Sequence, residues 1–101
     1  MAVPGTSLFN LQTVTAATPA KVGATGVRRL MGCVIYPASA ITKVEFKDAA
    51  TDTGTVILTL QGADDGNSIF HDFTTIGGIP FGTAMFCKPV GASAIVYVWY
   101  D

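Results

Sequence analysis

The sequence is poor in charged residues: only 13% are Asp, Glu, Lys or Arg, while half of all residues are hydrophobic. Soluble domains usually carry about 25% charged residues, so this chain has too few charges to cover the surface of a monomer. A membrane-spanning helix needs about 20 consecutive apolar residues, and the longest apolar run, Ala94–Tyr100, is much shorter. We therefore expect other protein chains, not a membrane, to cover the excess apolar surface.

Basic residues are also scarce, since the six Lys and Arg are spread thinly through a chain of net charge −1. No basic stripe of the kind that binds phosphates is present, so nucleic acid is not expected as a partner. The opening residues, MAVPGTSLFN, lack the charged and apolar regions of a secretory signal. Synthesis and folding in a cytoplasm are therefore expected.

Few side chains of this sequence could carry out catalysis or bind a metal. The single histidine is followed by Asp72, but adjacent residues of a strand point to opposite faces, so they cannot form a catalytic pair and no enzyme is expected. Instead, the ring of His71 is expected to pack at an interface or rim, where its polar tip finds one partner. Two cysteines without further ligands cannot build a zinc site, so we expect neither a metal nor another cofactor.

The two cysteines, Cys33 and Cys87, each lie inside a strand-like apolar segment. We expect them to be buried free thiols that act as small hydrophobic side chains. A disulfide is possible only if their strands face each other at the right distance, and a reducing compartment disfavours it.

Helical spacing of apolar residues is absent, and short segments rich in Val, Ile, Thr and aromatic residues alternate with Gly, Pro, Asp and Asn clusters. This pattern predicts an all-β protein. A chain of 101 residues fits one domain, expected to be an antiparallel β-sandwich or a small jelly-roll-like barrel of about seven or eight strands. We expect residues 1–11 to form an extended N-terminal arm and residues 12–101 to form the β-sandwich domain.

Two segments carry apolar residues on both faces, which predicts central strands covered on both sides. In RRLMGCVIY, simple alternation places Leu30, Val34 and Tyr36 on one face and Met31, Cys33 and Ile35 on the other. In SAIVYVWYD, it places Ile95, Tyr97 and Trp99 on one face and Val96, Val98 and Tyr100 on the other. We expect one face of the second segment to lie in the core and the other against a neighbouring subunit.

The segment AITKVEFKD, by contrast, alternates cleanly between apolar and charged residues. It predicts a strand with Val44 and Phe46 inward and Lys43, Glu45 and Lys47 toward solvent. The turn residues that follow predict a β-hairpin with TVILTLQ, whose inward residues would be Val56, Leu58 and Leu60. The segment IGGIPFG, which begins at Ile76, predicts a loop or a bend at a sheet edge because of its Gly and Pro residues.

The segments GVRRLMGCVIYP and GIPFGTAMFCKPVGASAIVYVWYD resemble parts of small phage-encoded β-sandwich virion proteins. The second has their Gly-containing loop, short strand, Gly-Ala turn and closing strand of alternating Val and Tyr. This resemblance implies a virion structural protein made in the host cytoplasm, of the capsid decoration or head–tail accessory type. It also implies that the protein associates with itself, with a trimer favoured, and with major capsid or tail proteins.

The candidate interface residues are aromatic or apolar side chains near the two ends of the chain: Leu8, Phe9, Tyr97, Trp99 and Tyr100. Leu8 and Phe9 would anchor the arm on the sheet edge of a neighbour. An alternative function, a small carbohydrate-binding module with a jelly-roll fold, would use the three aromatic residues of the last strand as a stacking platform. The apolar neighbours of these residues favour a core or a subunit interface instead.

Overall fold

The computed structural model describes residues 9–36, 42–62, 68–91 and 93–101. Within these ranges the chain forms strands and one short 3-10 helix, and no α-helix, so the prediction of an all-β fold is confirmed. The strands are β1 (Asn10–Thr15), β2 (Ala20–Val22), β3 (Arg28–Tyr36), β4 (Lys43–Asp48), β5 (Val56–Gln61), β6 (Ile69–Asp72), β7 (Ile79–Phe81), β8 (Met85–Val90) and β9 (Ile95–Tyr100), and the 3-10 helix η1 spans Thr74–Ile76.

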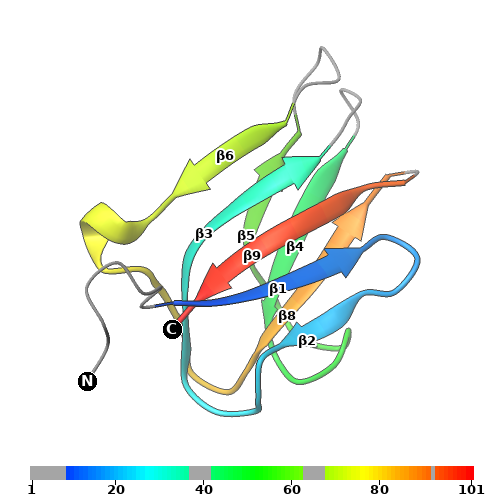
Figure 1. The fold of residues 1–101 in the computed structure, drawn as a ribbon. Coiled ribbons are helices and arrows are strands. Elements are labelled where there is room, and N and C mark those ends of the chain that lie inside the picture. The colour runs from blue at the N-terminus through cyan, green and yellow to red at the C-terminus, as the bar shows by residue number, and fades with distance from the viewer. Residues whose placement is uncertain (1–8, 37–41, 63–67, 92) are drawn as a thin grey trace.

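Two antiparallel sheets pack face to face as a β-sandwich (Figure 1). Sheet A has the strand order β1-β9-β3-β6, with the short β7 paired to the start of β3, and sheet B has the order β2-β8-β4-β5. Leaving β7 aside, β1 pairs with β9, β2 with β8, β3 with β6, and β4 with β5. This nested pairing is the connection order of a jelly roll.

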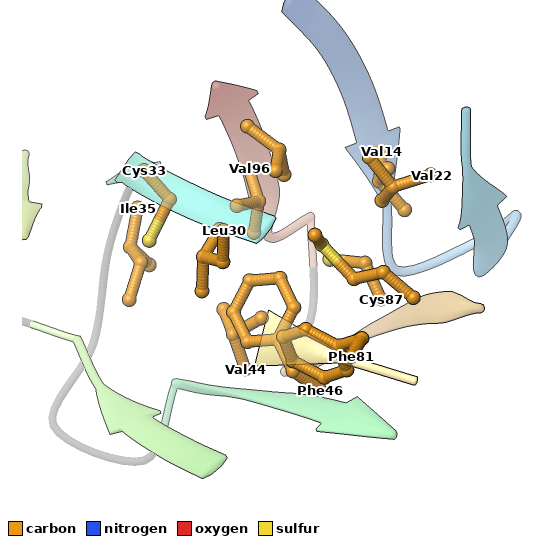
Figure 2. Close-up of a cluster of buried hydrophobic side chains, with 12 residues drawn as sticks. Val14, Val22, Leu30, Cys33, Ile35, Val44, Phe46, Phe81, Cys87 and Val96 are labelled. Atoms are coloured by element: carbon orange, nitrogen blue, oxygen red, sulfur yellow. The ribbon is translucent and has the colours of Figure 1, made fainter. Parts of the chain in front are cut away.

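The hydrophobic core fills the space between the two sheets, where side chains from both point toward one another (Figure 2). Every strand except the edge strands β5 and β6 contributes at least one fully buried side chain. The cluster consists of Val14, Val22, Leu30, Cys33, Ile35, Val44, Phe46, Phe81, Met85, Cys87, Val96 and Val98. The alternating pattern of the sequence therefore identified the inward residues Val44 and Phe46 correctly.

The two segments with apolar residues on both faces are the central strands of sheet A, as predicted. In β9 the two faces also separate as expected, because Val96 and Val98 are fully buried and Tyr97 is exposed. In β3 the predicted alternation is wrong at its start. A β-bulge shifts the register between Leu30 and Gly32, which leaves Met31 as an extra residue.

The bulge changes which residues of β3 share a face. Leu30, Cys33 and Ile35 all point into the core, while Val34 and Tyr36 lie on the outer side. Alternation had placed Leu30 on the opposite face from Cys33, but both side chains are buried in the core. Met31, the residue in the bulge, is also nearly buried.

Strands β4 and β5 form the predicted hairpin. Leu58 and Leu60 pack against the core, but a register shift between Phe46 and Lys47 leaves Val56 exposed, so the inward prediction for Val56 is wrong. Lys47, predicted to point into solvent, is buried because its ammonium group bonds to Asp52 in the hairpin turn.

Two further predictions concern segments outside the regular strands. The segment expected to be a loop or bend contains β7, whose three residues pair with Arg28, Arg29 and Leu30 at the edge of sheet A. Of the expected N-terminal arm, residues 1–8 lie outside the described residues. Strand β1 begins at Asn10, so Asn10 and Leu11 pair with Tyr100 and Trp99 at the end of β9.

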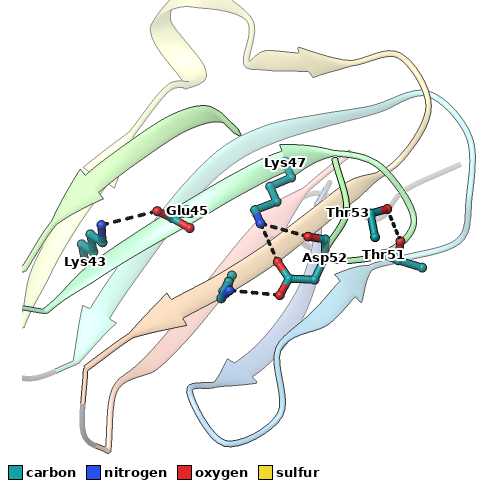
Figure 3. Close-up of polar contacts among 7 residues, drawn as sticks. Lys43, Glu45, Lys47, Thr51, Asp52 and Thr53 are labelled. Carbon is teal, nitrogen blue, oxygen red and sulfur yellow. Dashed lines mark hydrogen bonds and ion pairs between the residues drawn. The ribbon is translucent and has the colours of Figure 1, made fainter. Parts of the chain in front are cut away.

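The outer side of sheet B carries all four lysines of the chain. Cross-strand partners share a face of a sheet, and Lys21 and Lys47 both lie beside Phe86, while Lys88 lies beside Glu45. Lys43 completes the set and forms an ion pair with Glu45 (Figure 3). We call this surface, with its six charged residues Lys21, Lys43, Glu45, Lys47, Asp52 and Lys88, the lysine face.

Asp52 joins two of these lysines, since its carboxylate accepts hydrogen bonds from Lys47 and Lys88 (Figure 3). These bonds, with that of Lys47 the stronger, hold the pKa of the Asp52 carboxyl group below its usual value. Four ammonium groups against the two carboxylates of Glu45 and Asp52 leave the lysine face with a net charge of +2.

The two cysteines are buried free thiols, as predicted. Burial raises the pKa of Cys33 to about 12. The pKa of Cys87 is raised further, first by its own burial and then by the neighbouring Cys33. Because only the thiolate is an effective nucleophile, both thiols should be inert in the folded protein.

We expect neither Cys33 nor Cys87 to react with Ellman's reagent at pH 8 while the protein is folded. Both are shielded by the core and protonated at this pH. In concentrated urea, both should react rapidly, which serves as the control for reagent and stoichiometry. A thiol that reacts at the same rate with and without urea would show that its strand is not packed as described.

Candidate functional site

The outer side of sheet A carries a contiguous set of large apolar side chains. Because cross-strand partners point to the same side, the registers of β1, β9, β3 and β6 place Thr13, Tyr97, Val34 and Phe70 in one row across the sheet. The adjacent rows contain Leu11 beside Trp99, and Ile95 beside Tyr36. We call this surface, made of Leu11, Val34, Tyr36, Phe70, Ile95, Tyr97 and Trp99, the aromatic face.

Much of the aromatic face is open in the single chain. Phe70 is 60% exposed, and Leu11 and Tyr36 are about half exposed. Isolated exposed apolar residues are normal, but a contiguous patch marks a contact surface. The second apolar side of β9 and β3 is therefore not covered by the described residues of the chain itself.

A groove of about 370 Å³ runs along the aromatic face where β9, β3 and β6 lie side by side. Its lining residues are Phe9, Met31, Gly32, Val34, Phe70, Asp72, Thr74 and Trp99. The rings of Phe70 and Trp99 form one wall and meet edge to face, with their centroids 6.1 Å apart and their planes at 77°. Gly32, which lies opposite Trp99, adds no side chain to the groove, and an added Cβ there would lie 3.5 Å from the ring of Phe70.

Among the described residues that line this groove, Asp72 and Thr74 carry the carboxylate and hydroxyl groups, and these two side chains bond to each other. Asp72 Oδ1 accepts hydrogen bonds from the backbone N–H of Thr74, at 2.9 Å, and from its hydroxyl group, at 2.7 Å. These bonds lower the pKa of the Asp72 carboxyl group. The groove thus offers mainly apolar and aromatic contact surface.

The single histidine points away from the groove. His71 lies opposite the buried Cys33 on the inner side, whereas Asp72 lies opposite Gly32 on the outer side, as expected for neighbouring strand residues. The ring of His71 stacks on Phe73, with centroids 6.5 Å apart. A hydrogen-bond partner was predicted for the imidazole of His71. One of its nitrogens, the buried Nε2, makes no hydrogen bond.

The structure brings together three of the five candidate interface residues. Phe9 and Trp99 both line the groove, and Tyr97 lies in the next row of the aromatic face. Tyr100 lies on the opposite side of β9, where it packs against the core. Leu8 lies outside the described residues.

Sequence reasoning missed Phe70, the most exposed aromatic side chain of the aromatic face. The sequence feature that could have indicated it is the segment SIFHDFTT, which carries apolar residues on both faces of an alternating strand. The pairing of β6 with β3, which brings Phe70 beside Val34, joins segments far apart in the sequence and could not be deduced from either segment. The sequence pattern placed Tyr36 on the same face as Leu30. The bulge in β3, which the pattern did not reveal, puts these two side chains on opposite faces.

Within the ranges that the structure describes, no group of three or more His, Cys, Asp or Glu side chains is placed to hold a metal ion. Nor does this part of the chain contain a helix long and apolar enough to cross a membrane. Comparison of the chain with protein-family models, curated proteins and solved structures found no match.

Proposed function

We propose that this protein is a noncatalytic virion structural protein, of the capsid decoration or head–tail accessory type. It associates with itself, with a trimer favoured, and with major capsid or tail proteins on the particle. The observation that supports this most directly is the aromatic face, which the described residues leave uncovered although it carries Tyr97 and Trp99. A subunit whose chain has only 13% charged residues gains stability when such a surface is buried against another subunit.

The jelly-roll connection order is compatible with this proposal but does not decide it. Viral capsid proteins and lectins both use jelly rolls, and a fold hosts many functions. The chemistry of the groove favours protein contact over the alternative, a carbohydrate-binding module. A sugar site needs many polar groups among its aromatic residues, whereas most of the described lining residues are apolar or aromatic and Asp72 Oδ1 already accepts two hydrogen bonds from Thr74.

Light scattering after size-exclusion chromatography tests the self-association. At micromolar concentration we expect a mass of several 10.5 kDa chains, with three copies as the favoured number. A clean monomer would contradict the proposal, since nothing would then cover the aromatic face. The fluorescence of Trp99, titrated with a glycan panel, tests the alternative, and a saturable change would favour a carbohydrate-binding module.

The genes beside the one that encodes this chain test its place in a virion. Neighbouring portal, capsid or tail genes are expected. A setting among genes for polysaccharide degradation would contradict the virion assignment and leave the self-association to be explained otherwise.

A further inference from the structure

We propose that the aromatic face is the surface on which a second copy of this chain packs, with Phe70 as its main anchor. This inference rests on the self-association in the proposed function and names the surface that produces it. Three properties of the face support this inference: its composition, its charge and its size.

The composition of the aromatic face matches that of a protein interface. Interface centres are rich in Trp, Tyr and Phe and poor in Lys, Glu and Asp, while their rims are polar. Five of the ten aromatic residues of the chain lie on this face or in its groove: Phe9, Tyr36, Phe70, Tyr97 and Trp99. Polar residues lie at its margins, with Thr13 on the edge strand β1 and Asp72 at the end of the edge strand β6.

Charge distinguishes the aromatic face from the lysine face as a surface for a second copy. Two copies that met through their lysine faces would bring together surfaces of net charge +2, and juxtaposed like charges are costly. The aromatic face has no lysine. Among the described residues, its charged groups are Asp72 at one margin and, at the end of the sheet, Arg29 and Asp101, which form an ion pair. The aromatic face can therefore lie against a second copy with little repulsion.

The size of the face sets how much of it a second copy must cover. Four strands spaced about 4.8 Å apart and about 20 Å long give a flat area of roughly 400 Å². A standard interface buries about 800 Å² of accessible surface on each partner, and the side chains make the accessible surface larger than the flat area. The groove alone is therefore too small, and a stable contact has to extend over all four strands and onto Phe9 at the margin.

Phe70 is the side chain best placed to anchor this contact. It is 60% exposed, lies on the short edge strand β6, and is held in position by its edge-to-face contact with Trp99. In protein interfaces a few residues supply most of the binding energy, and these are often aromatic side chains packed into the partner. Phe70 can enter the groove of a neighbour without a change in the core of its own subunit.

The test compares Phe70→Glu with Ile57→Glu, which adds the same charge to a 49% exposed residue of β5 in sheet B. With Phe70→Glu we expect self-association to weaken by roughly thirtyfold or more, so that light scattering gives the mass of a monomer at micromolar concentration. Ile57→Glu should keep the wild-type mass. Unreactive thiols confirm that each variant is folded. Should Phe70→Glu expose its thiols, Tyr97→Glu, in the centre of the same face, is judged by the same criterion.

The outcomes separate this inference from the proposed function. A wild-type protein that is monomeric contradicts self-association itself, and the proposed function with it. An assembly that persists in folded Phe70→Glu and Tyr97→Glu, or that is lost in Ile57→Glu instead, contradicts only the choice of surface. Loss of assembly in Phe70→Glu with a normal Ile57→Glu supports the aromatic face as the contact between copies.

Discussion

Replacing Ile35 with alanine is expected to lower the free energy of unfolding by about 2–5 kcal/mol. Ile35 is only 1% exposed and lies in β3, the strand with neighbours β9 and β6 on its two sides. The substitution removes apolar atoms from a packed core and leaves a cavity. The neighbouring strands cannot move in to close it, because backbone hydrogen bonds hold them in place. Since small domains are stable by about 5–15 kcal/mol in total, this one change would remove a large part of the stability.

The measurement is urea unfolding followed by the fluorescence of Trp99, at one protein concentration for all variants. Ile57→Ala is the matched control, because it removes the same atoms from a strand residue that is 49% exposed. We expect a change of less than about 1 kcal/mol for this control. Equal losses in the two variants would mean that Ile35 does not face the core.

Replacing Gly78 with alanine is expected to destabilise the protein by about 2–4 kcal/mol, the sum of backbone strain and a steric clash. The residue has a φ of +89°, which side chains other than that of glycine rarely adopt. An added Cβ would also lie 2.6 Å from Met31 Sδ and 3.2 Å from Arg29 Cβ. The side chain of Met31 would therefore have to shift, and Arg29 would have to give way slightly.

Gly77→Ala separates the strain from the clash. Gly77 has a similar φ of +81°, but nothing lies within 4 Å of an added Cβ. We expect this variant to lose only about 1–2 kcal/mol, measured by the same urea unfolding. If the two alanine variants lose the same amount, the close approach of Gly78 to Met31 does not contribute to the packing.

The sequence predicted best those strands in which one face is apolar and the other charged. Alternation identified Val44 and Phe46 as core residues because a shift of one residue would have placed Lys43 or Glu45 between the sheets. Burial of Lys47 was not foreseen because it depends on Asp52, whose position is set by the conformation of the turn. Patterning therefore fixes a strand only where its two faces differ in chemistry.

The same reasoning failed for strand β3 because its two faces do not differ in chemistry. Met31, the extra residue of the bulge, is as apolar as Leu30, so no residue type marks the change of face. The aromatic face was predicted only in part for a related reason. Tyr97 and Trp99 belong to one strand and were seen together, whereas Phe70 reaches them only through the order β9-β3-β6, and one sequence does not specify strand order.

The position of the lysines has a practical consequence for how this molecule can be attached to a solid support. Amine-coupling reagents react with accessible lysine side chains, and the accessible lysines, Lys21, Lys43 and Lys88, all lie on the outer side of sheet B, where Lys47 is buried. Chains tethered through these side chains share one orientation on a sensor chip. Tyr97 and Phe70, on the far side of the sandwich, then point into the flowing solution.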